Sequence, residues 1–165
     1  MKYSVTETIW GGLGRNPNRK RRDTPSFPPK ITSRRRDGEA FLILFLSKRG
    51  MSRAPMAREV LRKLLREGSL QGTFRISCRG VSKEYDHCPI DQRMLEVSQN
   101  HSYSLPSFSR VVLDPELAKA HLVLTMGRES EIFVEKNREK ITGATRQFEQ
   151  FLPTGSDGPL PDPFL

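Results

Sequence analysis

Residues 40–46 form a continuous apolar run, which is the feature that most restricts how this chain can fold. The run is far too short to span a bilayer, and it is typical of a β-strand that is covered on both faces. A loop over residues 47–53 follows it, and Pro55 then stands at the start of a helical pattern, where its missing N–H costs nothing. A buried strand, a short loop and an amphipathic helix in this order predict the first unit of a parallel α/β sheet.

The same alternation of apolar runs and helical patterns continues along the rest of the chain. The first helix, at 55–67, is expected to bury one stripe formed by Val60, Leu61, Leu64 and Leu65. Further strands are expected at 73–78, 121–126 and within 141–151, and further helices at 90–97, from 114 onwards and at 129–137. These elements predict an α/β fold over residues 40–152, a four-stranded parallel sheet with helices on both faces. Such sheets bind ligands beyond the carboxyl ends of their strands, where the loop 47–53 lies.

The basic character of the chain is concentrated at its N-terminus. The whole chain carries a net charge of +9, and residues 1–38, with ten Lys/Arg and three Asp/Glu, account for +7 of it. This segment has no apolar periodicity, so we expect residues 1–38 to be a basic disordered tail and residues 39–165 to be the folded domain. The tail is expected to bind polyanions weakly and non-specifically, in a manner that salt screens.

Composition argues against several classes of protein. The two cysteines, Cys78 and Cys88, are too few for a disulfide framework, and we expect them to be idle thiols. No Cys/His spacing fits a zinc site, and neither His87 nor His121 has a partner at metal-ligand spacing, so we expect no metal and no cofactor. The sequence also shows no apolar signal region and no membrane span, and we expect a cytoplasmic protein.

The loop has the composition of an anion-binding cradle, formed by Ser47, Lys48, Arg49, Gly50, Met51, Ser52 and Arg53. A loop between a strand and a helix directs backbone N–H groups inward, and the positive end of the helix dipole adds to their field. Arg53 would supply an always-charged fork for phosphate oxygens, and Gly50 would let the backbone come close. The alternative is an ordinary strand-to-helix loop with a surface arginine.

Several motifs in the same order along residues 40–165 resemble the low-molecular-weight protein tyrosine phosphatase family, whose fold is shared with one class of arsenate reductases. That family has a Cys-x5-Arg loop followed by Ser-Pro-Met-Ala, and a distant Asp-Pro-Tyr/Phe. The matching segments here are Phe45-Leu46, Arg53 with Pro55-Met56-Ala57, Cys78-Arg79-Gly80, Pro89-x-Asp91-x-Arg93, the run 120–126, and Pro161-Asp162-Pro163-Phe164. Ordered matches across a whole domain are far more specific than a single loop.

The resemblance implies a role for individual residues of this chain. In the family, a cysteine thiolate attacks phosphorus, an arginine holds the equatorial oxygens, and an aspartate protonates the leaving group. Carried over, Ser47 occupies the nucleophile position, Arg53 is the clamp and Asp162 is the general acid. Tyr85 lies where the family often has an aromatic beside the cradle, so it either flanks the substrate ring or simply packs as a loop aromatic.

Ser47 is the departure from the family pattern that matters most for function. Loop dipoles and an arginine lower the pKa of a thiol enough to ionise it, but a serine hydroxyl is a much weaker acid, and the sequence shows no His or Lys in a position to act as its base. Other departures are Arg49-Gly50 where the family has Gly-Asn, Ser52 in place of a second cysteine, and Ala54 in place of a serine.

These observations predict a pseudophosphatase of this family, whose partner is a phosphotyrosine protein or a free phosphate or other oxyanion. Two alternatives stay open. One is a working phosphatase of the same family, with Ser47 or another group as nucleophile. The other is an interaction protein that acts through its basic tail, with a vestigial cradle.

Overall fold

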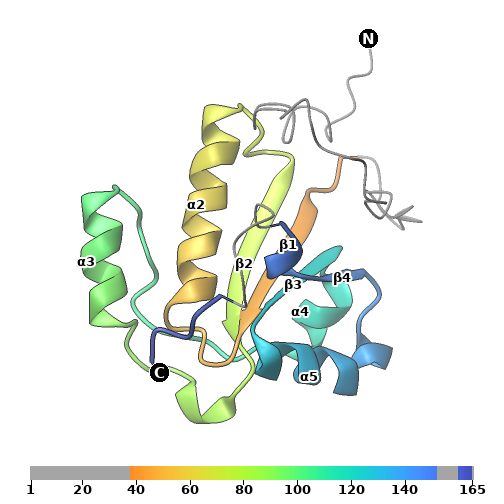
Figure 1. Ribbon diagram of the computed structural model, residues 1–165. Coiled ribbons are helices and arrows are strands. Elements are labelled where there is room, and N and C mark those ends of the chain that lie inside the picture. The colour runs from red at the N-terminus through yellow and green to blue at the C-terminus, as the bar shows by residue number, and fades with distance from the viewer. Residues whose placement is uncertain (1–37, 152–159, 165) are drawn as a thin grey trace, which may run out of the picture. The chain divides into compact units, whose positions relative to one another are not determined.

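A computed structural model of the chain describes residues 38–151 and 160–164 (Figure 1). Its strands are β1 (Phe41–Ser47), β2 (Phe74–Gly80), β3 (Leu122–Met126) and β4 (Ala144–Gln147). Its helices are α2 (Arg53–Glu67), α3 (Gln92–Asn100), α4 (Asp114–Lys119) and α5 (Arg128–Lys136). Short 3-10 helices lie between or after these elements, at η1 (Lys83–Tyr85), η2 (Arg138–Lys140) and η3 (Phe148–Phe151).

The four strands form one sheet, in which all neighbours are parallel and the spatial order is β2-β1-β3-β4. The first strand in the sequence therefore lies inside the sheet, between β2 and β3. Its last residue, Ser47, pairs with Gly80 of β2 on one side and with Met126 of β3 on the other. The carboxyl ends of three strands thus meet where the loop begins.

The side chains of β1 alternate between two hydrophobic clusters, because successive residues of a strand point to opposite faces. Phe45 packs with Ala54 of α2 on one face of the sheet. Leu44 packs on the other face with Leu117 of α4 and Val134 of α5. Both faces are therefore covered by helices, with α2 on one side and α4 and α5 on the other (Figure 1).

The predicted fold class is confirmed, since the sheet has four parallel strands with helices on both faces. The prediction that Leu64 belongs to the buried stripe of the first helix is wrong. Leu65 is buried, but Leu64 is 57% exposed, because the stripe of α2 that meets the sheet follows the four-residue spacing of Leu61 and Leu65 and Leu64 lies beyond its edge.

The predicted basic tail, residues 1–38, lies almost wholly outside the described residues, which begin at Gly38. Within the described part of the chain, no helix is both long enough and apolar enough to cross a membrane.

Candidate functional site

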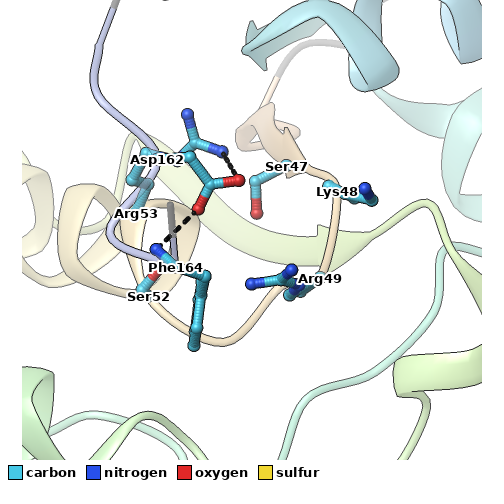
Figure 2. Close-up of a pocket in the computed structure, with 7 residues that line it drawn as sticks. All are labelled: Ser47, Lys48, Arg49, Ser52, Arg53, Asp162 and Phe164. Atoms are coloured by element: carbon cyan, nitrogen blue, oxygen red, sulfur yellow. Dashed lines mark hydrogen bonds and ion pairs between the residues drawn. The ribbon is translucent and has the colours of Figure 1, made fainter.

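A small pocket opens at the carboxyl edge of the sheet, over the loop that joins β1 to α2. It is lined by Ser47, Lys48, Arg49, Ser52, Arg53, Asp162 and Phe164 (Figure 2). Five of these residues belong to the loop 47–53, and two come from the C-terminal segment 160–164. The three residues expected at the nucleophile, clamp and acid positions therefore line one pocket.

Ser47 is the last residue of β1 and is only 3% exposed. Its Oγ accepts a hydrogen bond from the backbone N–H of Gly50 at 3.1 Å. Within the described residues, no carboxylate, imidazole or amine forms a hydrogen bond with this hydroxyl. The hydroxyl is thus supplied with a donor but not with a base.

Arg53 is the first residue of α2, and its guanidinium is held on two sides. It donates to the carbonyl of Leu160 at 3.1 Å and lies 3.7 Å from Oδ2 of Asp162 (Figure 2). Behind it, a Cβ on Gly127 would lie 3.1 Å from a guanidinium nitrogen and would press on it, and the φ of +101° at this position is one that glycine adopts without strain. The other Asp162 oxygen accepts from the N–H of Phe164 at 3.1 Å.

The loop is braced against β2 by a contact between two glycines. A Cβ on Gly50 would lie 2.5 Å from the backbone nitrogen of Gly80, and a Cβ on Gly80 would lie 2.7 Å from the carbonyl oxygen of Arg49. Gly50 also has φ +68°, a left-handed conformation that other residues adopt only with strain. Only a pair of glycines lets these two backbones approach so closely.

The loop also presents backbone N–H groups that the protein does not use. In the described part of the chain, the amides of Arg49, Met51 and Ser52 donate to no acceptor. Ser52 is the N-cap of α2, and its side chain does not cap the helix. Free N–H groups in a strand-to-helix loop and at a helix start form a ready anion site, so an anion bound at the pocket would give these donors their acceptors.

The guanidinium of Arg49 stacks on the rings of both Tyr85 and Phe164. Its central carbon lies 4.2 Å from the ring centre of Phe164 and 5.1 Å from that of Tyr85, and Arg93 lies 5.5 Å over the Phe164 ring. Tyr85 thus lies beside the loop, with its ring face turned to a loop arginine.

Lys48 points away from these rings to a residue that follows β3. Its Nζ lies 3.2 Å from Oε1 of Glu129, near the start of α5. The backbone N–H of Glu129 and then the Lys48 ammonium hold the pKa of this carboxyl below its usual value, while the nearby Asp162 carboxylate opposes the shift. The charge of Lys48 is therefore compensated within the protein.

A neighbouring helix supports the middle of the loop. The carbonyl of Met51 accepts from the N–H of Asp91, the residue that caps α3. The Asp91 carboxylate pairs with Arg93 at 2.8 Å and 3.1 Å, and these contacts hold the pKa of Asp91 below its usual value. The segment 89–93, which resembles a motif of the phosphatase family, therefore leads into a helix whose N-cap residue contacts the loop 47–53.

The cysteines and histidines lie outside the pocket lining. Cys78 is buried in the core, where burial raises the pKa of its thiol, and Cys88 is half-buried. His121 accepts from the N–H of Leu42 and stacks on Phe41. Among the residues that the structure describes, no group of three or more His, Cys, Asp or Glu side chains could hold a metal ion.

Three contributors to the pocket were not foreseen from the sequence. They are the carbonyl of Leu160, the space left by Gly127 and the ring of Phe164 against Arg49. Gly127 gave the clearest signal, as a glycine between a buried strand and a helix, while the other two depend on how the C-terminal segment folds back.

The model of the family described as low molecular weight phosphotyrosine protein phosphatase matches residues 42–165. A search of curated proteins finds no match. Solved structures with the same fold include YfkJ from Bacillus subtilis, with 19% identity and a TM-score of 0.70 over 78% of this chain and 82% of that one.

A product-state mimic of a protein tyrosine phosphatase from Entamoeba histolytica has 20% identity and a TM-score of 0.69, over 76% of this chain and 81% of that one. The arginine phosphatase YwlE, a Bacillus subtilis protein, was solved as a cysteine-to-serine mutant with a phosphorylated active-site serine. It has 20% identity and a TM-score of 0.64, over 75% of this chain and 79% of that one. These likenesses show the shared fold. The family match covers most of the chain, and the chain therefore belongs to the low molecular weight phosphotyrosine protein phosphatase family.

Proposed function

We propose that this chain is a pseudophosphatase, which binds phosphate or a phosphorylated side chain in the loop 47–53 but hydrolyses phosphate esters at a rate near background. The observation that carries the proposal is the buried hydroxyl of Ser47, which has a donor and no base within the described residues. A nucleophile of this kind needs either ionisation at neutral pH or an adjacent base. Ser47 has neither.

Anion binding does not depend on the missing thiol. Arg49 and Ser52, whose amides are unused, line the pocket together with Arg53, and Ser52 stands at the positive end of α2. We assign the clamp to Arg53, because a planar guanidinium binds two phosphate oxygens at once. Lys48 also lines the pocket, with its ammonium paired to Glu129.

The phosphorylated serine of the YwlE mutant shows that the active site of that protein has room for a phosphoryl group on a serine. In the present chain, we assign Asp162 to the acid position, where it would protonate a leaving group. Its Oδ2 lies 3.7 Å from the guanidinium of Arg53, so the proposed acid and the proposed clamp stand side by side in the pocket.

An active phosphatase with Ser47 as nucleophile is the second candidate, and the phosphorylated serine of the YwlE mutant is the observation that favours it. An interaction protein acting through residues 1–38 is the third, motivated by the +7 charge of that segment. The second candidate predicts turnover that depends on Ser47, and the third predicts that the loop 47–53 binds no anion.

The binding half of the proposal is tested by calorimetric titration of the full chain with inorganic phosphate and vanadate. Arg53→Ala should lose most of the affinity, about tenfold or more, because a charge-assisted bidentate contact disappears. Asp162→Ala should bind at least as well as wild type, because it removes a negative charge from the pocket. If wild type binds neither oxyanion, the cradle is vestigial and the interaction-protein reading takes precedence.

A further inference from the structure

The guanidinium of Arg49 is the unusual group at this pocket, because two aromatic rings hold it and no carboxylate of the described residues pairs with it. It lies 4.2 Å from the ring centre of Phe164 and 5.1 Å from that of Tyr85. Among the described residues, Arg49 forms no ion pair, and its Nε is buried with no hydrogen-bond partner. Figure 2 shows the side chains of Arg49 and Phe164 together at the pocket lining.

This arrangement uses the surfaces that an aromatic substrate would need. A phosphate monoester of a phenol places its ring just outside the cradle, where it gains from stacking on aromatic faces. A guanidinium is flat and stacks on such faces equally well, through cation–π attraction. Here the protein's own side chain covers the faces of Phe164 and Tyr85, so an incoming ring would have to displace it.

The positive charge of Arg49 is retained at the pocket while its side chain covers the rings. No acidic partner among the described residues neutralises it, in contrast to Lys48, which pairs with Glu129, and Arg93, which pairs with Asp91. Arg49 therefore attracts a phosphate dianion and obstructs an aryl group at the same time.

We propose that Arg49 is a specificity-determining residue, which directs the cradle towards free phosphate and non-aromatic phosphate esters and away from aryl phosphates. The inference rests on the proposed function, because it assumes that phosphate binds in the loop 47–53. It names the chemical class of the ligand that this site prefers.

The test compares the affinities of full-length wild type, Arg49→Ala and Lys48→Ala for inorganic phosphate and for phenyl phosphate, by titration calorimetry. Lys48→Ala is the matched control, because it also removes one loop cation but leaves the stack on Tyr85 and Phe164 in place. Wild type should bind phenyl phosphate no more tightly than phosphate. Arg49→Ala should raise the ratio of phenyl phosphate to phosphate affinity about tenfold, since the surfaces of Tyr85 and Phe164 that Arg49 covers become free. Lys48→Ala should weaken both ligands by a similar factor and leave the ratio unchanged.

Retention of phosphate binding in Arg49→Ala also reports that the loop is still folded. The inference is overturned if wild type already prefers phenyl phosphate tenfold, or if the ratio in Arg49→Ala equals that in Lys48→Ala. It is also overturned if Arg49→Ala alone abolishes phosphate binding, because Arg49 would then be the anion anchor. If wild type binds no phosphate, the proposed function fails and this inference fails with it.

Discussion

Substitution of Gly50 by alanine probes the backbone contact that braces the loop against β2. The new Cβ would lie 2.5 Å from the nitrogen, and 2.9 Å from the Cα, of Gly80. Both are backbone atoms of a strand that is paired with β1, so neither can turn away as a flexible side chain would. The φ of +68° at Gly50 adds a second penalty.

The two penalties can be estimated separately. A left-handed conformation costs a non-glycine residue about 1–2 kcal/mol. Forcing extra volume into a packed site costs about 1–3 kcal/mol more. We therefore expect Gly50→Ala to lower the free energy of unfolding by about 2–5 kcal/mol, and the melting temperature by about 5–15 °C.

The matched control is Gly72→Ala, because a Cβ on Gly72 would meet nothing within 4 Å. Thermal and urea unfolding of both variants, followed by circular dichroism, measure the difference. Gly72→Ala should lie close to wild type, and Gly50→Ala should also lose phosphate affinity because its loop amides move. If the two variants unfold within about 0.5 kcal/mol of each other, a margin typical of neutral surface substitutions, the contact does not fix the loop.

Two further predictions concern titratable groups. Arg93 first, and then backbone donors, hold the pKa of Asp91 below its usual value. A depressed carboxyl pKa contributes stability above the unfolded pKa of about 3.9, and this stability is lost as the pH falls through the folded pKa. Asp91→Ala should therefore melt below wild type at pH 7, with a gap that narrows below about pH 4; a gap that stays constant down to pH 3 would contradict this. Burial raises the pKa of the Cys78 thiol, whereas Cys88 is half-buried, so iodoacetamide should label Cys88 first in the native protein and Cys78 only after unfolding. Equally rapid labelling of both thiols, detected by mass spectrometry with Cys88→Ser as the control, would refute the burial argument.

The sheet could be predicted from the sequence because its signals are local. The run 40–46 is apolar at every position, and β1 does bury side chains such as Leu44 and Phe45 on opposite faces. Leu64 shows the limit of this reasoning. Apolar spacing identifies a helix, but it does not say how wide a stripe the sheet will cover, and α2 leaves this leucine exposed.

The pocket was predictable only in part, for a physical reason. The loop's glycine and arginine are visible in one stretch of sequence, and the resemblance to a family supplied Asp162. The stack of Arg49 on Phe164 depends on how a distant segment returns to the cradle, and the Gly50–Gly80 contact depends on the register of two strands. Neither arrangement leaves a periodic or local trace in the sequence.

Whether Ser47 is a working nucleophile is tested most directly by the rate of phosphate release by wild type, Ser47→Ala and Ser47→Cys. The rate is measured with p-nitrophenyl phosphate and also with an alkyl phosphate, so that exclusion of aryl groups by Arg49 does not mask the result. We expect wild type and Ser47→Ala to be equally slow, because the buried hydroxyl of Ser47 has a donor and, among the described residues, no base. Ser47→Cys should be faster than both, because the loop amides and Arg53 lower the pKa of a thiol there. A rate of phosphate release by wild type clearly above that of Ser47→Ala would contradict this expectation, because Ser47 would then be a working nucleophile.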